Sequence, residues 1–343
     1  MKTIYPSYLD KFNCIADKCP DTCCAGWKVC IDNNTYKKYK SVKGEFKKEL
    51  NRLIIKGKTP CFKLKNGRCA FLDEQNLCKI YSTLGKESLS EVCKSHPRFI
   101  ENFGAIKEIT LSLSCPESVR LLYDEDLSFV ERLDDTLPVL NEIDTKIFNY
   151  LNESRADLFN FIFDKNLNLS EILGGIINLK DILQEEIDDA TFIKIEYEKA
   201  DEFRFNIDLV QDIIKTLSKC TFTRKNIKNT ITKITNLIFT DNFINELNDY
   251  LNTTPHKNFI IKILAIYIFR FYLTAVYDGK ILDKIILCLY SILYIICAFY
   301  VESTLDDNTY NYLNIVKEYS REIFHCDKNV KYIIKTVNRK NLI

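Results

Sequence analysis

The sequence of 343 residues is poor in glycine, with only nine in the whole chain. None of them forms a G-x-G or G-x-x-x-x-G-K-[ST] motif, which excludes the phosphate-binding turns of doubly wound nucleotide folds and of P-loop proteins. A G-x-S-x-G nucleophile elbow and the H-E-x-x-H helix of zinc proteases are also absent. Hydrolases of these classes are therefore disfavoured.

The N-terminal residues lack the apolar run of a signal peptide. The segment MKTIYPSYLDKFNCIA is interrupted by polar residues throughout, so the expected location is cytoplasmic. In a reducing cytoplasm, clusters of cysteines bind metal or take part in chemistry more often than they form disulfides.

A long uncharged run occurs only once. Residues 285–301, IILCLYSILYIICAFYV, carry no charge over 17 positions, which is just the lower limit for a membrane span. The run contains a serine and three tyrosines, and the apolar segment before it is broken by Lys262 and Arg270. We therefore expect a central buried helix of an α-helical bundle and no membrane span.

Charge is balanced overall at +1 but unevenly distributed. Residues 1–120 carry 22 basic against 13 acidic residues, and residues 121–343 carry 26 against 34. Either the two halves attract each other, or the basic half offsets buried cysteine thiolates. Nucleic-acid binding is not expected, because the first half has no arginine-rich or aromatic-interleaved stripe.

Cysteine is the abundant residue of the first half. Ten of the fourteen cysteines lie in residues 1–120, and this shift predicts a domain boundary, with a cysteine-rich lobe at 1–120 and a helical domain at 121–343. The stretch CPDTCCAGWKVC alone, at residues 19–30, holds four cysteines and the single tryptophan.

Apolar periodicity predicts mostly α structure. In the first half, residues 33–55 have helical spacing, and residues 66–85 read as a hairpin followed by one helical turn. In the second half, helices are expected at 170–187, with Ser170 as N-cap, at 207–217 and at 227–251. The predicted fold is an irregular cysteine-rich N-terminal lobe that binds a metal cluster, followed by an α-helical bundle.

The cysteine spacing favours a soft-metal site. Dense thiolates bind zinc or iron–sulfur clusters, and the paired C-x2-C knuckles of zinc ribbons are absent. The C-x3-C-x2-C spacing of enzymes that cleave S-adenosylmethionine reductively is also not met, since Cys24 and Gly26 follow Cys23. Cys220, Cys288 and Cys297 lie in apolar helical surroundings and are expected to be buried without a ligand.

Four motifs in order give a resemblance to a known family. FNCIADKCPDTCCAGWKVCIDNNTYKKY, CAFLDEQNLCKIY, LSEVCKSHPRF and LSLSCPES resemble the flagellin lysine-N-methylase family and related proteins with zinc- or iron-chelating cysteine clusters. The resemblance covers about residues 12–118. One departure is His96 in SHPR, where an aromatic residue, usually tyrosine, is expected.

The resemblance implies methyl transfer from S-adenosylmethionine to lysine ε-amines of flagellin by an enzyme that holds an iron–sulfur cluster, expected as 4Fe–4S, with zinc as the alternative metal. Whether one or two centres form is open. The cysteine motif falls on eight residues, the implied metal ligands: Cys14, Cys19, Cys23, Cys24, Cys69, Cys78, Cys93 and Cys115. Cys30 and Cys61 are peripheral to it.

Lysine methylation needs a neutral amine, so a group must take up its proton. Tyr81, Glu91 and Glu117 lie beside the expected ligands and are candidate catalytic residues, although each one alone suits an ordinary structural role. Trp27 and Arg98 are candidates for binding the donor, by stacking or cation–π attraction and by pairing with a carboxylate. For Trp27, shielding a cluster from water is the more common role of such a residue. For Arg98, a salt bridge within the lobe is more common than binding a donor.

Two other functions use the same cysteines. The chain could be a non-enzymatic zinc- or iron-binding module, which full metal occupancy without donor binding would favour. It could also be a redox or radical enzyme of another class, which reduction-dependent product formation would favour.

Overall fold

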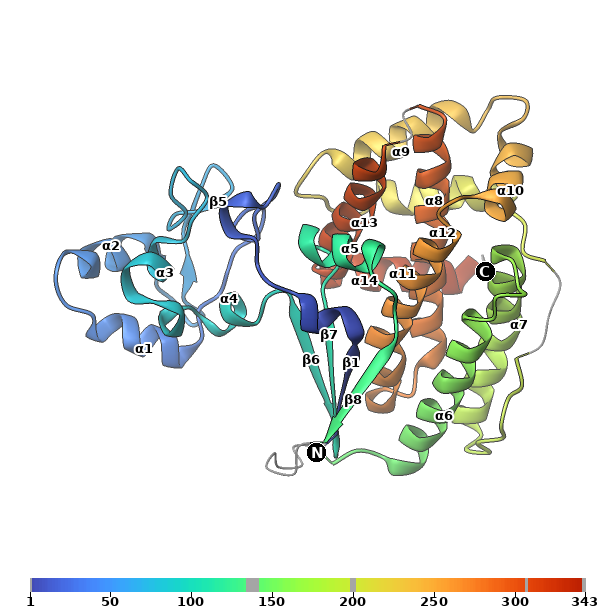
Figure 1. The fold of residues 1–343 in the computed structure, drawn as a ribbon, viewed down its shortest axis with the longest axis horizontal. Coiled ribbons are helices and arrows are strands. Elements are labelled where there is room, and N and C mark those ends of the chain that lie inside the picture. Colours follow the sequence, from blue (N-terminus) through green and yellow to red (C-terminus); the bar gives the residue numbers. More distant parts are fainter. Residues whose placement is uncertain (1, 134–141, 198–201, 306–307, 341–343) are drawn as a thin grey trace.

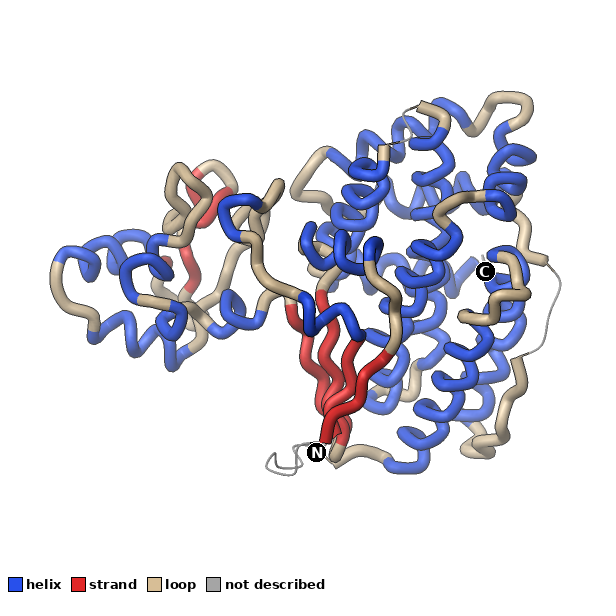
Figure 2. Tube along the Cα trace, in the orientation of Figure 1, coloured by secondary structure: helices blue, strands red, loops and turns tan. Residues whose placement is uncertain are grey.

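The computed structural model describes residues 2–133, 142–197, 202–305 and 308–340. Two parts are visible in Figure 1: a small lobe to one side and a larger helical body, with a sheet between them. We use "cysteine lobe" for residues 24–95 and "helical body" for the helices from residue 116 onward. Figure 2 shows that helix dominates, which confirms the predicted mostly-α fold with a cysteine-rich N-terminal region.

The cysteine lobe consists of short elements around a small apolar core. Its helices are α1 (Asn33–Ser41), α2 (Glu45–Leu53), α3 (Lys79–Leu84) and α4 (Glu91–Ser95). Two-residue strands form the pairs β2 (Ile54–Ile55) with β3 (Cys61–Phe62), and β4 (Leu64–Lys65) with β5 (Arg68–Cys69). The expected helix at 33–55 is in fact two, because Gly44 adopts a positive φ of 80° between them. The expected hairpin and helical turn at 66–85 are confirmed.

A four-stranded sheet connects the lobe to the body, and the sequence analysis missed it. The strands are β1 (Lys2–Pro6), β6 (Arg98–Phe103), β7 (Ile106–Leu111) and β8 (Phe129–Leu133), in the order β6-β7-β1-β8. A two-residue turn at Gly104 joins β6 to β7. Each strand is only five or six residues long and mixes charged with apolar residues. The alternation of apolar and polar residues that would predict a strand is therefore weak.

The helical body is arranged around α12 (Ile281–Ser303), in which nineteen residues are buried. This confirms the expected central buried helix at 285–301. The helices around it are α5 (Pro116–Asp124), α6 (Thr145–Ile162), α7 (Leu169–Asp188), α8 (Ile207–Ser218), α9 (Asn226–Leu237), α10 (Phe243–Thr253), α11 (Lys257–Phe271), α13 (Thr309–Phe324) and α14 (Asp327–Lys340). Two stretches, 257–277 and 281–303, have the length and composition of a membrane span, and 78% and 100% of their most apolar windows are buried in the fold.

Two predictions about helices of the body were wrong: the N-cap of α7 and the single helix at 227–251. Helix α7 begins one residue before Ser170, and its N-cap is Asn168, whose side chain accepts from the Glu171 N–H while the Glu171 carboxylate accepts from the Asn168 N–H. This capping box satisfies two backbone donors where serine alone would satisfy one. The segment 227–251 divides into α9 and α10, because the chain turns at residues 238–242.

Among the described residues, the buried apolar side chains form two separate cores. One core lies wholly within residues 24–93, and the other extends from Tyr8 and Phe12 through Phe103 and Leu111 to α14. The sheet therefore packs with the helical body. The domain boundary expected at residue 120 stays a prediction.

Candidate metal centre

Backbone pairing places the first cysteines of the motif beside the later ones. The Cys69 N–H donates to the Cys24 carbonyl at 2.7 Å, and the Gly26 N–H donates to the Gly67 carbonyl at 2.8 Å. Gly26 has a φ of +88°, and a Cβ there would lie 2.7 Å from Arg321 Nη2. Glycine is thus required for this loop to turn tightly beneath the arginine.

Two of the cysteines begin helices. Cys78 is the N-cap of α3 and Cys115 is the N-cap of α5. Burial raises the pKa of Cys78, and raises that of Cys115 to about 12, while two backbone N–H groups of each helix's first turn counter the rise. N–H groups at a helix N-terminus stabilise a thiolate, which is the form that binds metal.

Other cysteines of the motif also receive hydrogen bonds. Burial raises the pKa of Cys69 to about 12 and that of Cys93 to about 11, and in each case a hydrogen bond acts in the opposite direction. A hydrogen bond from Cys23, followed by one from Thr22, outweighs burial and lowers the pKa of Cys24 to about 7. These sulfur atoms are therefore buried but still have donors directed at them, as metal-bound thiolates require.

Four of the cysteines form a group inside the lobe, which we call the lobe set: Cys24, Cys69, Cys78 and Cys93. After burial, the charge of other members raises the pKa of Cys69, Cys78 and Cys93, so that every pair among the four interacts. All four also belong to, or contact, the apolar core of the lobe.

The other four lie between the lobe and the helical body, and we call them the junction set: Cys14, Cys19, Cys23 and Cys115. After burial, the charges of Cys19 and Cys14 raise the pKa of Cys115. The charge of Cys14 also raises the pKa of Cys19. It raises that of Cys23 too, but there the effects of Cys24, burial and the lobe-set residue Cys93 are larger. The adjacent residues Cys23 and Cys24 thus link the two sets.

The donor chemistry of each set fits a metal centre. Each set has four thiols, which is the ligand number of tetrahedral zinc and of an iron–sulfur cluster, and hydrogen-bond donors are directed at six of the eight: Cys19, Cys24, Cys69, Cys78, Cys93 and Cys115. In the part of the chain that the structure describes, no three His, Cys, Asp or Glu side chains are already close enough to hold a metal ion. The assignment of the eight cysteines as ligands therefore stays a prediction.

A cluster of ion pairs connects the loop at residues 19–25 to the helical body. The Asp21 carboxylate lies 2.6 Å from Arg224 Nη1, 3.1 Å from Lys317 Nζ and 3.4 Å from Arg321 Nη1. Although burial opposes ionisation, these cations hold the pKa of Asp21 well below its usual range. Arg321 also donates to the Ala25 carbonyl. Residues 19–25 are thus held against α13 by charge-assisted hydrogen bonds.

Trp27 packs among other side chains at the same junction. Its ring stacks on His325 at 5.2 Å between centroids, and the Arg321 guanidinium lies 4.1 Å from its centroid. The His96 ring is 6.1 Å away, and burial, followed by the charge of Arg321, lowers the pKa of His96 to about 4. These contacts fit the shielding role better than stacking on a donor.

The residues of this junction on α13 were missed in the sequence. Lys317 and Arg321 are four residues apart and share one side of α13, and His325 directly follows the last residue of that helix at the same spacing. That spacing could have indicated a shared contact surface. It could not have identified Asp21 as the partner, because Asp21 is about three hundred residues away in sequence.

The three candidate catalytic residues lie on three different short helices. Tyr81 on α3 is 53% exposed, and Glu91 on α4 is exposed and pairs with Lys94 at 3.4 Å. Glu117 on α5 is buried and accepts hydrogen bonds from two nitrogens of Arg120, Nη2 at 2.7 Å and Nε at 2.9 Å. This pairing leaves the Glu117 carboxylate poorly suited to accept a proton. The roles of the three residues stay predictions.

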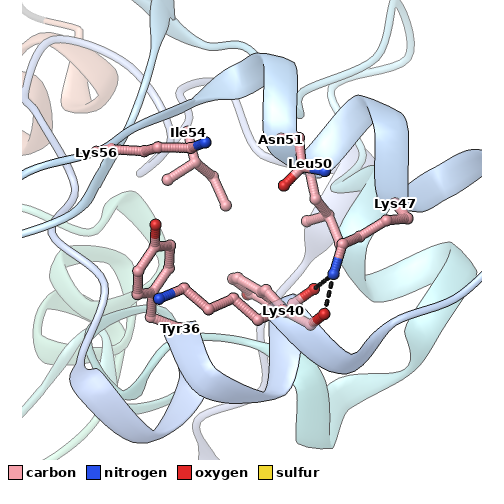
Figure 3. Close-up of a pocket in the computed structure, with 8 residues that line it drawn as sticks. Tyr36, Lys40, Lys47, Leu50, Asn51, Ile54 and Lys56 are labelled. Atoms are coloured by element: carbon pink, nitrogen blue, oxygen red, sulfur yellow. Dashed lines mark hydrogen bonds between the residues drawn. The ribbon is translucent and has the colours of Figure 1, made fainter.

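The candidate donor-binding Arg98 lies at the start of β6, with its guanidinium 5.1 Å from the centroid of Phe12. A separate pocket of about 320 Å³ lies between α1 and α2, and cysteine is not among its lining residues. Figure 3 shows Lys47 reaching across this pocket, where its Nζ donates to the Tyr39 carbonyl at 3.2 Å and to that of Lys40. Lys47 thereby satisfies carbonyls at the end of α1.

Comparison with known proteins supports a shared cysteine-rich segment. Residues 13–112 match the family described as "Putative zinc- or iron-chelating domain". Over 130 residues the chain is 35% identical to the "Lysine-N-methylase" of Salmonella typhimurium, covering 35% of this chain and 32% of that protein. It is also 35% identical over 130 residues to the "Flagellar biosynthetic protein FliU" of Salmonella muenchen, covering 77% of that protein.

The match therefore spans about a third of the length of the Salmonella methylase. No solved structure matches the chain significantly.

Proposed function

Because the chain belongs to the family of the lysine-N-methylase and FliU proteins, we propose that it is a metal-dependent protein lysine N-methyltransferase. The methyl donor would be S-adenosylmethionine, and the substrate would be lysine ε-amines of flagellin. The substrate proposal is supported by the name of the Salmonella muenchen relative, a flagellar biosynthetic protein.

The observation that carries the metal part is the arrangement of eight cysteines as two sets of four. Hydrogen-bond donors are directed at all four sulfur atoms of the lobe set and at those of Cys19 and Cys115 in the junction set. The lobe set would hold one centre through Cys24, Cys69, Cys78 and Cys93, and the junction set would use Cys14, Cys19, Cys23 and Cys115. We propose iron–sulfur clusters, with zinc as the alternative.

The junction set is the better place for the reaction. It lies where the lobe and the body meet, and Cys14 and Cys23 are exposed, so a ligand can approach. An iron–sulfur cluster held by three of these four cysteines would keep one open iron site. That site would supply coordination for the amino and carboxylate groups of the donor, which would replace the missing glycine-rich turn.

The protein's own residues would prepare the lysine. Transfer breaks the sulfur–methyl bond of the donor, forms a nitrogen–methyl bond and releases one proton from the amine. Partial burial around Trp27 and His96 would favour a neutral amine, because burial disfavours its charged form. Tyr81 and Glu91 remain candidates to receive the proton.

The metal is tested by purifying the protein without oxygen and measuring iron, acid-labile sulfide and zinc. We expect iron and sulfide, a brown colour and bleaching in air. Cys23→Ser and Cys93→Ser, one from each set, should each lose metal, whereas Cys288→Ser, a buried cysteine of α12, should keep it. A colourless protein with stoichiometric zinc would contradict the cluster, and equal metal in all three variants would contradict the ligand assignment.

Methyl transfer is tested with the metal-loaded protein, isotopically labelled S-adenosylmethionine and flagellin of the same organism. We expect mass increments of one or more methyl groups at exposed lysines, and missed tryptic cleavages at the same sites. Cys23→Ser is the negative control and Cys288→Ser the matched positive control. Unmodified flagellin, with metal intact and donor bound, would reject flagellin as the substrate.

A metal-binding module without catalysis is the second candidate, and it is favoured by the match of residues 13–112 to a chelating domain alone. Full metal occupancy with no binding of S-adenosylmethionine would select it.

A further inference from the structure

Two cysteines outside the metal sets lie directly opposite each other in the lobe. Cys30 and Cys61 form an isolated antiparallel bridge, and their Sγ atoms are 3.1 Å apart. Cys30 is exposed, and Cys61 is 4% exposed, at the start of β3. The charges that shift the pKa of Cys61 come from Cys30 and Lys28, and neither of these belongs to the lobe set or the junction set.

The backbone around this pair has the geometry that a disulfide needs. The Ile31 N–H donates to the Pro60 carbonyl at 2.8 Å, and the Phe62 N–H donates to the Val29 carbonyl at 3.0 Å. Cys30 and Cys61 therefore occupy a non-hydrogen-bonded antiparallel position, where the Cα atoms approach to about 4.5 Å. That separation is within the range of about 4.4–6.8 Å observed across disulfides.

We propose that Cys30 and Cys61 form a reversible disulfide by exchange with a low-molecular-weight disulfide, as a redox-sensitive site separate from the metal centre. The exposed Cys30 thiolate attacks the small disulfide, forms a mixed disulfide and releases one thiolate. Cys61 then loses its proton and attacks the Cys30 sulfur, which forms the protein disulfide and releases the second thiolate. Two protein thiols are oxidised and one small disulfide is reduced to two thiols.

The order of the two steps follows from exposure. Burial raises the pKa of Cys61, and the Cys61 thiol also points toward the Thr59 carbonyl at 3.4 Å, so it is shielded from a small oxidant. Once Cys30 carries a leaving group, the short distance between the sulfur atoms makes the second step intramolecular.

The disulfide would close the chain segment that contains α1 and α2, since the two cysteines are 31 residues apart. A disulfide lowers the conformational entropy of the unfolded lobe, and it therefore stabilises the folded lobe relative to the unfolded one. The lobe would then be held by two independent means, metal ligation and the disulfide.

The experiment treats the metal-containing, full-length protein with oxidised glutathione, alkylates the remaining thiols and digests it with trypsin without reduction. We expect a linked peptide pair, VCIDNNTYK (29–37) with TPCFK (59–63), and an unchanged metal content. In Cys61→Ser, Cys30 should instead carry one glutathione. Cys220→Ser, which removes a buried cysteine of neither set, should give the same linked pair as the original chain.

A stable glutathione adduct on Cys30 of the original chain would overturn the proposal, because Cys61 would then have failed to resolve it. Linkage of Cys30 to a member of either metal set would also overturn it. So would separate alkylation of both cysteines under conditions that oxidise a model dithiol. Reversal of the linked pair by reduced glutathione, with metal still bound, is the result expected for a reversible site.

Discussion

The cysteine lobe and the helical body are stabilised in different ways. The lobe core has nine buried residues, one of which is a proposed metal ligand, whereas α12 alone contributes nineteen buried residues to the body. A core of nine residues buries too little apolar surface to stabilise a domain of about seventy residues by itself. From this comparison we predict that burial alone stabilises the body, whereas the lobe depends on its thiols being held together.

Removing the metal should have the largest effect. Structural zinc contributes about 10–16 kcal/mol of apparent binding energy in small domains, and this energy becomes folding energy. Strong chelation, or Cys24→Ser, should abolish hydrogen-exchange protection in residues 24–95 and leave α12 protected. Cys297→Ser, a buried cysteine of α12, is the control for losing a thiol. Equal loss of protection in both parts would show that they fold as one unit.

A substitution that creates a cavity in the body should destabilise the body and leave the lobe unaffected. Leu293 is fully buried in α12, so Leu293→Ala should destabilise the body by about 2–5 kcal/mol through lost contacts and an unfilled cavity. Thermal unfolding followed by circular dichroism measures the effect, while iron or zinc content should not change. Leu305→Ala, at a residue that is 58% exposed, is the matched control and should have little effect. Metal loss in Leu293→Ala would contradict the separation of the two cores.

Breaking the junction should loosen the contact between the two parts without unfolding either. Asp21→Asn removes the charge that three cations share, and unsatisfied buried groups cost about 1–3 kcal/mol each. Faster proteolysis or a wider solution scattering profile would report the loosening. Asp17→Asn changes an exposed carboxylate nearby and should leave the profile unchanged. An unaltered profile for Asp21→Asn would mean that other contacts hold the junction.

The smallest effect should be a pH dependence at the same junction. Burial, followed by the charges of Arg270, His96 and Arg321, lowers the pKa of His325 to about 3. Because the unfolded histidine titrates near pH 6.5, the unfolded state binds more protons between about pH 3 and 6.5. Stability should therefore fall with decreasing pH in that window. The slope should be well below the limit of about 1.4 kcal/mol per pH unit for one group, because the His325 side chain is exposed and solvent screens its charge.

His325→Gln should reduce this slope, which denaturant unfolding at several pH values would measure. His256→Gln replaces a histidine of the body away from the junction and serves as the control. An identical slope in His325→Gln would assign the acid sensitivity to other groups.

Sequence alone could predict elements whose signal is local. The helices around α12 follow from apolar periodicity, and the cysteine-rich lobe follows from motif spacing. The sheet could not be predicted, because β1 pairs with β7 and β8, about one hundred or more residues away. The junction could not be predicted for the same reason: the partners of Asp21 are on α13 and at Arg224. The division of the cysteines into two sets likewise depends on pairing between distant segments, such as Cys24 with Cys69.

The place of β1 in the sheet has a consequence for synthesis of the chain. Lys2 lies opposite Ile106 on one side and opposite Leu133 on the other, so β1 cannot pair until more than a hundred later residues have left the ribosome. The lobe lies between β1 and β6 in sequence and its contacts are local, so it can fold during that interval. Metal capture by the nascent lobe could thus precede closure of the sheet, and cellular metal supply would then influence the yield of folded protein.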